Sequence, residues 1–380
     1  MVGFRLYSRL NKILSRLKTF YSFFFSRKKL MTSGTLVALD IGRSSVKATA
    51  YSNGLKYGVI FPSIVSRIST ILNHGTLYAV EHEIVEMGMK ASGGVDGDTN
   101  AKPERYFTGE SARIHSDVSS KLGLYPGWIE TEEYAVLVKS AKKRFAAQGV
   151  IGLDDALIVV GTPSRYFQAQ RSIMEVATYD AWPAKIKVLS QPIGAYLSFL
   201  LDENGVLIKE NMIDGHGNKR SWAVIVVGFY ATDFHIFKEG CSQQSRAESF
   251  GGVSAAVSHL QRALLNLRGI DIDLLKAERA LRDRKIKYRG SYLSVENEVA
   301  NAIQPIADAI IQQAQAVFAD DVGDLDGILL AGGAAAIVAE SLKAKWQHTK
   351  ILENPQMAVS EGYLRYAKSA ASKTAKESGT

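Results

Sequence analysis

The fold of this chain is decided by the stretch Leu36-Val37-Ala38-Leu39-Asp40-Ile41-Gly42-Arg43-Ser44-Ser45-Val46-Lys47. Its leading apolar residues predict a buried strand, and the turn that follows contains Gly42. Strand character resumes over residues 45–51 and stops at Asn53-Gly54, the dipeptide most typical of a tight hairpin turn. We therefore expect a strand–turn–strand unit that a hairpin turn closes.

A second unit of the same form begins 186 residues further along the chain. Residues 223–227 predict another buried strand, which ends at Gly228, and the alternating segment after it turns at Gly240. In both units the turn glycine follows the first glycine after twelve residues, from Gly42 to Gly54 and from Gly228 to Gly240. Repetition on this scale predicts two lobes of the same architecture.

The two glycine turns indicate phosphate binding. Glycine lets backbone N–H groups approach a phosphate without obstruction from a side chain, and two facing turns would hold a polyphosphate from both sides. Asp40 is placed to hold a hydrated Mg²⁺, and Lys47 can reach back to a β- or γ-phosphate. The spacing alone leaves open an ordinary turn aspartate and an exposed strand lysine.

Two of these segments resemble known nucleotide-binding motifs. Residues 40–47 resemble the first phosphate loop of the actin, Hsp70 and sugar-kinase superfamily. Residues 328–335, Ile328-Leu329-Leu330-Ala331-Gly332-Gly333-Ala334-Ala335, resemble the superfamily's adenosine motif, in which small residues let the purine lie against backbone.

Further segments resemble one branch of that superfamily, the ParM/StbA bacterial actins that segregate plasmids. They are Tyr106-Phe107-Thr108-Gly109-Glu110-Ser111-Ala112, Val159-Val160-Gly161-Thr162-Pro163 and Asn354-Pro355-Gln356-Met357-Ala358-Val359-Ser360-Glu361-Gly362-Tyr363-Leu364-Arg365-Tyr366. The resemblance extends from about Thr35 to Lys368.

The resemblance implies an α/β fold of the actin-like ATPase type, with two duplicated RNase H-like lobes around a nucleotide cleft. We expect a basic N-terminal extension over 1–34, lobe I over 35–222 with a small outer subdomain at about 56–150, and lobe II over 223–353. A C-terminal helix over 354–368 would return to lobe I, and a disordered tail would follow over 369–380. The residues themselves predict helices at 253–267, stopped by Gly269, and at 295–318.

The same resemblance implies a set of site residues. Asp40 would hold Mg²⁺, and Gln191 and Asp233 would have catalytic roles, with Gln191 orienting the attacking water. ATP would contact the two phosphate loops, the adenosine motif and a helix that starts near residue 271: Gly42, Arg43, Ser44, Ser45, Lys47, Gly228, Phe229, Tyr230, Ala231, Thr232, Lys276, Glu278, Gly332, Gly333 and Ala334. For Gln191 an ordinary helix cap is the alternative, and for Lys276 and Glu278 an exposed helical pair.

The second phosphate loop departs from the family pattern at Val226, where relatives place a second metal-directed aspartate. The loss removes one hydrogen-bonding partner of the Mg²⁺ hydration shell. Contacts from the backbone and Lys47 would still bind nucleotide, so we expect ATP binding with hydrolysis that is slow or absent.

The charge is concentrated at the N-terminus. The first 30 residues carry eight Lys and Arg and no acid, which accounts for the whole net charge of +8. The neutral remainder argues against direct binding of nucleic acid. The apolar residues of this segment recur at helical spacing, as in basic helices that lie on anionic membranes; a start at Met31 is the alternative. The single cysteine, Cys241, favours a cytoplasmic location.

Three functions remain open at this point. The leading hypothesis is an ATP-dependent filament of identical subunits that moves a plasmid through a DNA-binding adaptor protein. The second is a non-polymerising scaffold of the pilus or division type, which binds ATP and hydrolyses it little. A small-molecule kinase is the third, and no sugar-binding segment supports it.

Overall fold

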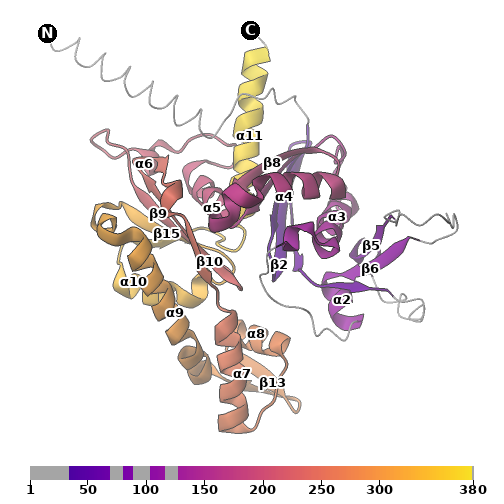
Figure 1. Cartoon of the computed structure of the whole chain (residues 1–380), viewed down its shortest axis with the longest axis vertical. Helices are drawn as coiled ribbons and strands as arrows, with labels where there is room; N and C mark the ends of the chain where they lie inside the picture. The colour runs from indigo at the N-terminus through magenta and orange to yellow at the C-terminus, as the bar shows by residue number, and fades with distance from the viewer. Residues whose placement is uncertain (1–33, 69–79, 89–102, 116–126, 379–380) are drawn as a thin grey trace.

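The computed structural model describes residues 34–68, 80–88, 103–115 and 127–378 (Figure 1). The N-terminal extension and its predicted amphipathic helix lie outside these ranges. The described chain is built around two main β-sheets, one of five strands and one of six. The first has the order β3-β2-β1-β7-β8, with β1 (Leu36–Ile41), β2 (Ser45–Ser52), β3 (Leu55–Pro62), β7 (Leu157–Thr162) and β8 (Lys185–Ser190).

The second sheet repeats this plan. Its order is β11-β10-β9-β15-β16, and one further strand, β12, pairs with β10. The strands are β9 (Trp222–Val227), β10 (Ala231–Lys238), β11 (Cys241–Ser242), β12 (Glu248–Gly251), β15 (Gly327–Ala331) and β16 (Thr349–Ile351). In each sheet the central strand pairs antiparallel with the next strand and parallel with a distant one. The predicted duplication into two similar lobes is therefore confirmed.

The turns that close the two hairpins have the predicted chemistry. Asn53 and Gly54 both have positive φ, 50° and 80°, as a type I′ turn requires. Glu239 and Gly240, with φ of 49° and 73°, repeat that geometry between β10 and β11. These turns join β2 to β3 and β10 to β11 and fix the register of those two pairs. The turn at Gly42 to Ser44 joins β1 to β2, whose register places Lys47 directly opposite Asp40.

Helices cover the outer faces of both sheets (Figure 1). On the first sheet α3 (Glu132–Ala147) packs over β1, β2 and β3, and α4 (Phe167–Ala181) packs over β7 and β8. The second sheet is covered by α7 (Ser254–Arg268), α9 (Glu296–Phe318) and α10 (Ala335–Lys345), with α8 (Leu274–Asp283) beyond them. The helices expected at 253–267 and 295–318 are confirmed, and Gly269 ends α7 in the left-handed conformation with φ of 63°.

Two helices fill the space between the sheets. They are α5 (Gln191–Leu200) and α11 (Ala358–Ser378), and they share one apolar core with the inner faces of both sheets. The helices touch through glycines, because a Cβ added to Gly362 would lie only 1.7 Å from the carbonyl oxygen of Gly194. This contact holds the two lobes together below the region where the strands β1 and β9 end.

The C-terminus corrects one expectation. A disordered tail was predicted over residues 369–380, but α11 continues through that segment to Ser378. Alanine and lysine favour helix, and no glycine or proline interrupts the segment before Gly379. Ala370 is buried in the described structure, so packing adds to this propensity.

A small outer subdomain projects from the first lobe. It contains a sheet of order β4-β6-β5, with β4 (Val65–Arg67), β5 (Ile84–Met87) and β6 (Glu104–Thr108), and the helix α2 (Gly109–His115). The remaining elements are the short helix α6 (Lys209–Met212) and a hairpin of β13 (Lys285–Tyr288) and β14 (Ser291–Ser294). Among the described helices, none combines the length and apolar character needed to cross a membrane.

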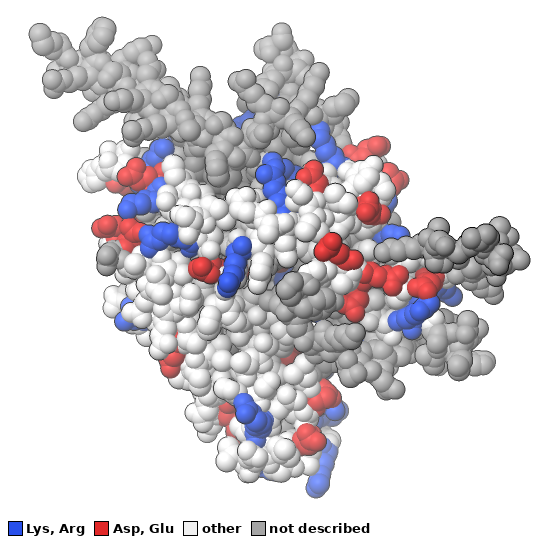
Figure 2. Space-filling view, in the orientation of Figure 1, with Lys and Arg blue, Asp and Glu red and all other residues white. Residues whose placement is uncertain are grey.

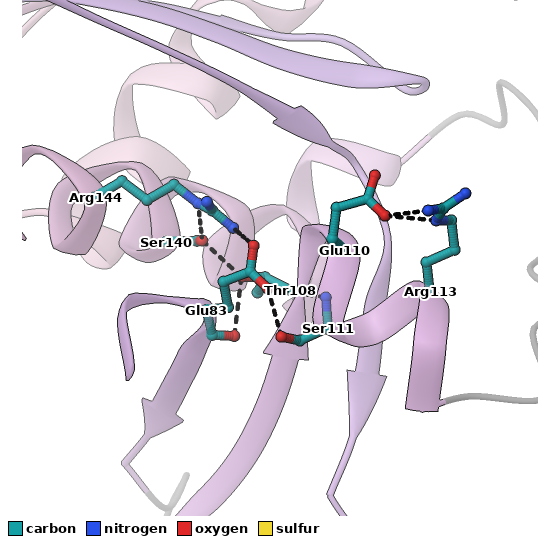
Figure 3. Close-up of polar contacts among 7 residues, drawn as sticks. All are labelled: Glu83, Thr108, Glu110, Ser111, Arg113, Ser140 and Arg144. Carbon is teal, nitrogen blue, oxygen red and sulfur yellow. Dashed lines mark hydrogen bonds and ion pairs between the residues drawn. The ribbon is translucent and has the colours of Figure 1, made fainter. Parts of the chain in front are cut away.

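Glu83 anchors this subdomain to α3 (Figure 3). Its buried carboxylate accepts hydrogen bonds from the Ser111 backbone N–H, at 2.9 Å, and from the Ser111 hydroxyl, at the start of α2. The other oxygen pairs with Arg144 of α3 at 2.9 Å. Burial alone would raise the pKa of Glu83, but the bonds from Ser111 and Arg144 outweigh it and lower that pKa. The ionised carboxylate therefore fixes α2 relative to the first lobe.

Candidate functional site

A cleft lies between the lobes, and the two glycine turns face it. It is lined by the turn after β1, at Gly42 to Ser44, by the turn after β9, at Gly228 to Ala231, and by Gly332 and Gly333 after β15. Gly332 has φ of 99°, and a Cβ there would lie 2.2 Å from the Val227 carbonyl oxygen. Only glycine allows this close approach of two backbones.

Asp40 is the centre of a polar group in this cleft. It is the penultimate residue of β1, and 4% of its surface is exposed. Lys47 donates to Asp40 Oδ2 at 3.2 Å, because the β1–β2 register places the two residues opposite each other. Gln191, the first residue of α5, donates through Nε2 to Asp40 Oδ1 at 3.0 Å. Lys47, from the same predicted loop, and Gln191, from a segment 151 residues away, therefore meet at the Asp40 carboxylate.

Asp233 faces the same cleft from the second lobe. It pairs with Val226 across the β9–β10 ladder, so both side chains point to the same side of the sheet. The Ser249 hydroxyl and the Ser164 backbone N–H donate to its Oδ1, the latter at 2.9 Å from the first lobe. Burial, and to a smaller extent the charge of Asp40, raise the pKa of Asp233 to about 6, against the effect of these bonds.

The other predicted residues divide into two groups. Arg43, Phe229 and Tyr230 line the cleft with the residues above, and Ser45, Glu278 and Ala334 line its continuation. Glu278 accepts a hydrogen bond from the Ser44 hydroxyl at 3.3 Å, across the two lobes.

Two predicted residues are directed away from the cleft. The Lys276 side chain is 69% exposed and pairs with Asp273, 3.4 Å away. Thr232 is fully buried, and its hydroxyl donates to the Gly251 carbonyl at 3.1 Å, so its contact is with the neighbouring strand.

Family comparisons agree with this architecture. A family model for the N-terminal domain of actin-like proteins matches residues 38–178. A second model, for the C-terminal part of the archaeal MreB-like actin homologue, matches residues 224–344. Together they account for most of both lobes. The chain is an actin-like protein.

Solved structures of other actin-like proteins share the fold of this chain. It is similar to a ParM filament from Clostridium botulinum, with 19% identity, a TM-score of 0.63, and coverage of 89% of this chain and 99% of that one. The chain is also similar to the archaeal actin homologue Ta0583 in complex with ADP, with 18% identity, a TM-score of 0.64, and coverage of 88% of this chain and 99% of that one. For the actin-like protein Alp7A the identity is 13% and the TM-score 0.68, with coverage of 90% of this chain and 99% of that one. At these identities the likeness shows the fold, and no curated protein matches the sequence.

The sequence missed several residues of the actin-like protein's cleft. Trp128, Gln170 and Met174 line it from the first lobe, and the Arg43 guanidinium lies 4.8 Å from the Trp128 ring centroid. Ser249, a donor to Asp233, was also missed. No local sequence pattern distinguishes Trp128, a single tryptophan that follows a glycine, from a core residue. The same holds for Ser249, which lies on the short strand β12.

The donor set of this actin-like protein fits magnesium with a bound triphosphate. Within residues 34–68, 80–88, 103–115 and 127–378, no group of three or more His, Cys, Asp and Glu could hold a metal ion by itself. Mg²⁺ is commonly held by one or two carboxylates, with waters and substrate phosphates supplying the other ligands. Asp40, nearly buried at the base of the cleft, can supply such a carboxylate.

Proposed function

We propose that this actin-like protein binds ATP with Mg²⁺ in the inter-lobe cleft and assembles into filaments in response to the nucleotide. The convergence of both glycine turns, the Gly332-Gly333 turn and the Asp40–Lys47–Gln191 group on one cleft carries this proposal. Backbone N–H groups at the turns would hold the phosphates, and Lys47 would exchange part of its contact with Asp40 for a phosphate oxygen.

Hydrolysis would depend on Gln191 and Asp233. Bound Mg²⁺ would neutralise phosphate charge, and Asp40 would hold it. The Gln191 side-chain amide, held by Asp40, can orient a water at the phosphate end of the cleft. Val226 offers no hydrogen bond beside Asp233, so we propose that ATP hydrolysis is slow. Filaments would then persist long after their subunits have bound ATP.

The cargo proposed for the filament is a plasmid bound through an adaptor protein. The ParM filament among the similar structures supports assembly of identical subunits, and head-to-tail contacts that do not close give filaments. On the face shown in Figure 2, Lys and Arg are interspersed with Asp and Glu over the described residues. This mixed surface favours an adaptor over direct DNA contact, and the exposed free Cys241 is compatible with a reducing cytoplasm.

Sedimentation with ATP, with ADP and without nucleotide tests the proposal, with phosphate release followed in the same samples. We expect pelleting with ATP and slow release of phosphate. Gln191→Ala should still pellet but should release phosphate at least tenfold more slowly, whereas Lys47→Gln should lose ATP-dependent pelleting. Wild-type protein that stays monomeric at high concentration with saturating bound ATP would refute the filament.

A second candidate is a scaffold that binds ATP without polymerising. Val226 favours it, because the missing carboxylate weakens the case for hydrolysis. The same assay separates the two: tight ATP retention with neither phosphate release nor pelleting would select the scaffold.

A further inference from the structure

A buried tyrosine hydroxyl lies directly below the cleft. Tyr363 of α11 is fully buried, and its hydroxyl has no hydrogen-bond partner among the described residues. Glycines make room for the side chain: a Cβ added to Gly161 would lie 1.7 Å from the hydroxyl oxygen, and one added to Gly194 would lie 2.6 Å from the ring. The hydroxyl therefore occupies the space where a side chain at position 161 would be.

The strand register shows which way this hydroxyl points. Gly161 lines the cleft, at the end of β7 next to β1. Leu36 and Ala38 of β1 pack into the core between the sheets, and side chains alternate along a strand, so Asp40 faces that side as well. The Tyr363 hydroxyl is thus the polar tip of the inter-lobe core, directly behind Gly161, which lines the cleft together with Asp40 and Asp233.

The electrostatics of the floor make this hydroxyl a donor. Burial raises the pKa of Tyr363 well above its ordinary value, and the carboxylates of Asp40 and Asp233 raise it further. A phenol that stays protonated beside two carboxylates can donate a hydrogen bond to a water held near them. A buried hydroxyl without a partner is destabilising, and phenylalanine would fill the same space without that cost. Because this hydroxyl also lies against Gly161, a residue of the cleft, its position points to a ligand in the cleft.

We propose that Tyr363 is a positioning residue of the nucleotide site, whose hydroxyl donates to a water of the Mg²⁺ hydration shell at the cleft floor. This inference rests on the proposed function, since it requires Mg²⁺–nucleotide in the cleft. Asp40 would hold the cation directly, and Tyr363 would orient one of its waters from below. Val226 provides no polar group at this floor, so the phenol supplies a hydrogen bond from α11 instead.

Tyr196 provides a matched control. It lies on α5 in the same core, is equally buried, and its hydroxyl likewise lacks a hydrogen-bond partner within the part of the chain that the structure describes. Burial raises its pKa as well, but the nearest carboxylate that adds to this effect is Asp326, which does not line the cleft. Tyr196→Phe therefore removes the same atom from the same core without touching the cleft floor.

The experiment measures ATP affinity of the full chain by calorimetry, with excess Mg²⁺ and with EDTA. We expect Tyr363→Phe to weaken binding about fivefold in Mg²⁺ and to leave the EDTA value unchanged, as loss of one hydrogen bond to the cation's water would. Tyr196→Phe should match the wild type in both. Without nucleotide, both variants should be at least as stable as the wild type in urea.

Three results would overturn the inference. The first is a Tyr363→Phe variant whose ATP affinity in Mg²⁺ equals that of the wild type. The second is a weakening of ATP affinity that is as large in EDTA as in Mg²⁺. The third is a loss of nucleotide-free stability, which would give the hydroxyl a structural partner. A wild-type protein that binds no ATP in either buffer would instead contradict the proposed function.

Discussion

At the scale of single residues, the pKa values of Asp233 and His235 on β10 are shifted in opposite directions. Burial raises the pKa of Asp233 to about 6 and lowers that of His235 to about 4. From about pH 4 to 6 the folded state holds more protons on Asp233 than the unfolded state does, so the Asp233 contribution to stability falls as pH rises. His235 holds fewer protons when folded, so its contribution rises over about pH 4 to 6.5. The two offset each other.

Asp233→Asn should expose the His235 contribution. We expect the free energy of unfolding of the nucleotide-free variant to rise by roughly 2 kcal/mol more than that of the wild type between pH 4 and 6, because the opposing Asp233 contribution is gone. Urea unfolding at pH 4, 5, 6 and 7 measures this, with Asp180→Asn on the exposed face of α4 as the control. Parallel pH profiles for wild type and Asp233→Asn would contradict it.

Glu278 and Lys276 should separate functionally. Glu278 lines the continuation of the cleft and bonds Ser44, whereas Lys276 is exposed. We expect Glu278→Ala to weaken ATP binding about fivefold, through loss of a contact to the nucleotide or to Ser44. Lys276→Ala should stay within about twofold, and titration with a fluorescent ATP analogue compares them. Equal effects of the two substitutions would refute this assignment.

The sequence could not make this separation. It predicted a helix there and assigned both residues to the nucleotide. Residues two apart on a helix point about 200° apart, so only one of them can face the cleft. Which one does so depends on how α8 is rotated against the second lobe, and that is set by contacts distant in sequence. Asp40 and Lys47 were easier, because a single hairpin register places them opposite each other.

At the scale of elements, the contact between α5 and α11 depends on glycine. Gly362→Ala would place a Cβ 1.7 Å from the Gly194 carbonyl oxygen, so the helices must separate. We expect a loss of about 3 kcal/mol in the free energy of unfolding, as in overpacked cores. Gly58→Ala, on β3 with open space around it, should change stability by under about 1 kcal/mol. Urea midpoints that coincide for the two variants would show that α11 can move without cost.

Elements with local signals were predicted well, and tertiary ones were not. Asn53-Gly54 and Gly269 mark their turn and helix end through backbone chemistry that neighbouring residues determine. The continuation of α11 was missed because a Ser- and Ala-rich segment reads as a tail until its packing is known. The Glu83 anchor was missed for a similar reason: its partner Arg144 lies 61 residues away, on another element.

Residues 1–30 lie outside the described structure, so their role stays a prediction. Their eight cations and helically spaced apolar residues predict binding to anionic membranes. We expect the full chain to pellet with vesicles that contain phosphatidylglycerol and a chain starting at Met31 to stay in the supernatant. Vesicles of phosphatidylcholine alone are the control. Equal pelleting of the two chains would remove the membrane contact.

At the scale of the whole molecule, the site is divided between two similar lobes. Asp40 and Lys47 belong to the first sheet, and Asp233 belongs to the second. Among the described residues, hydrogen bonds already join the two lobes from Ser164 to Asp233, from Arg165 to Ser249 and from Ser44 to Glu278. A ligand that contacts both phosphate turns would add to these bonds, so its binding energy would hold the lobes together.

This arrangement predicts that nucleotide stabilises the whole fold. At a free ATP concentration one hundred times the dissociation constant, with Mg²⁺, the free energy of unfolding should rise by about 2.7 kcal/mol, because ATP binds only the folded chain. Thermal melting with and without ATP measures the rise, and EDTA should reduce it at a fixed ATP concentration. Lys47→Gln should abolish most of the stabilisation by ATP, whereas Lys343→Gln on α10 should retain it. A wild-type melting temperature that saturating ATP leaves unchanged would mean that the cleft does not take ATP.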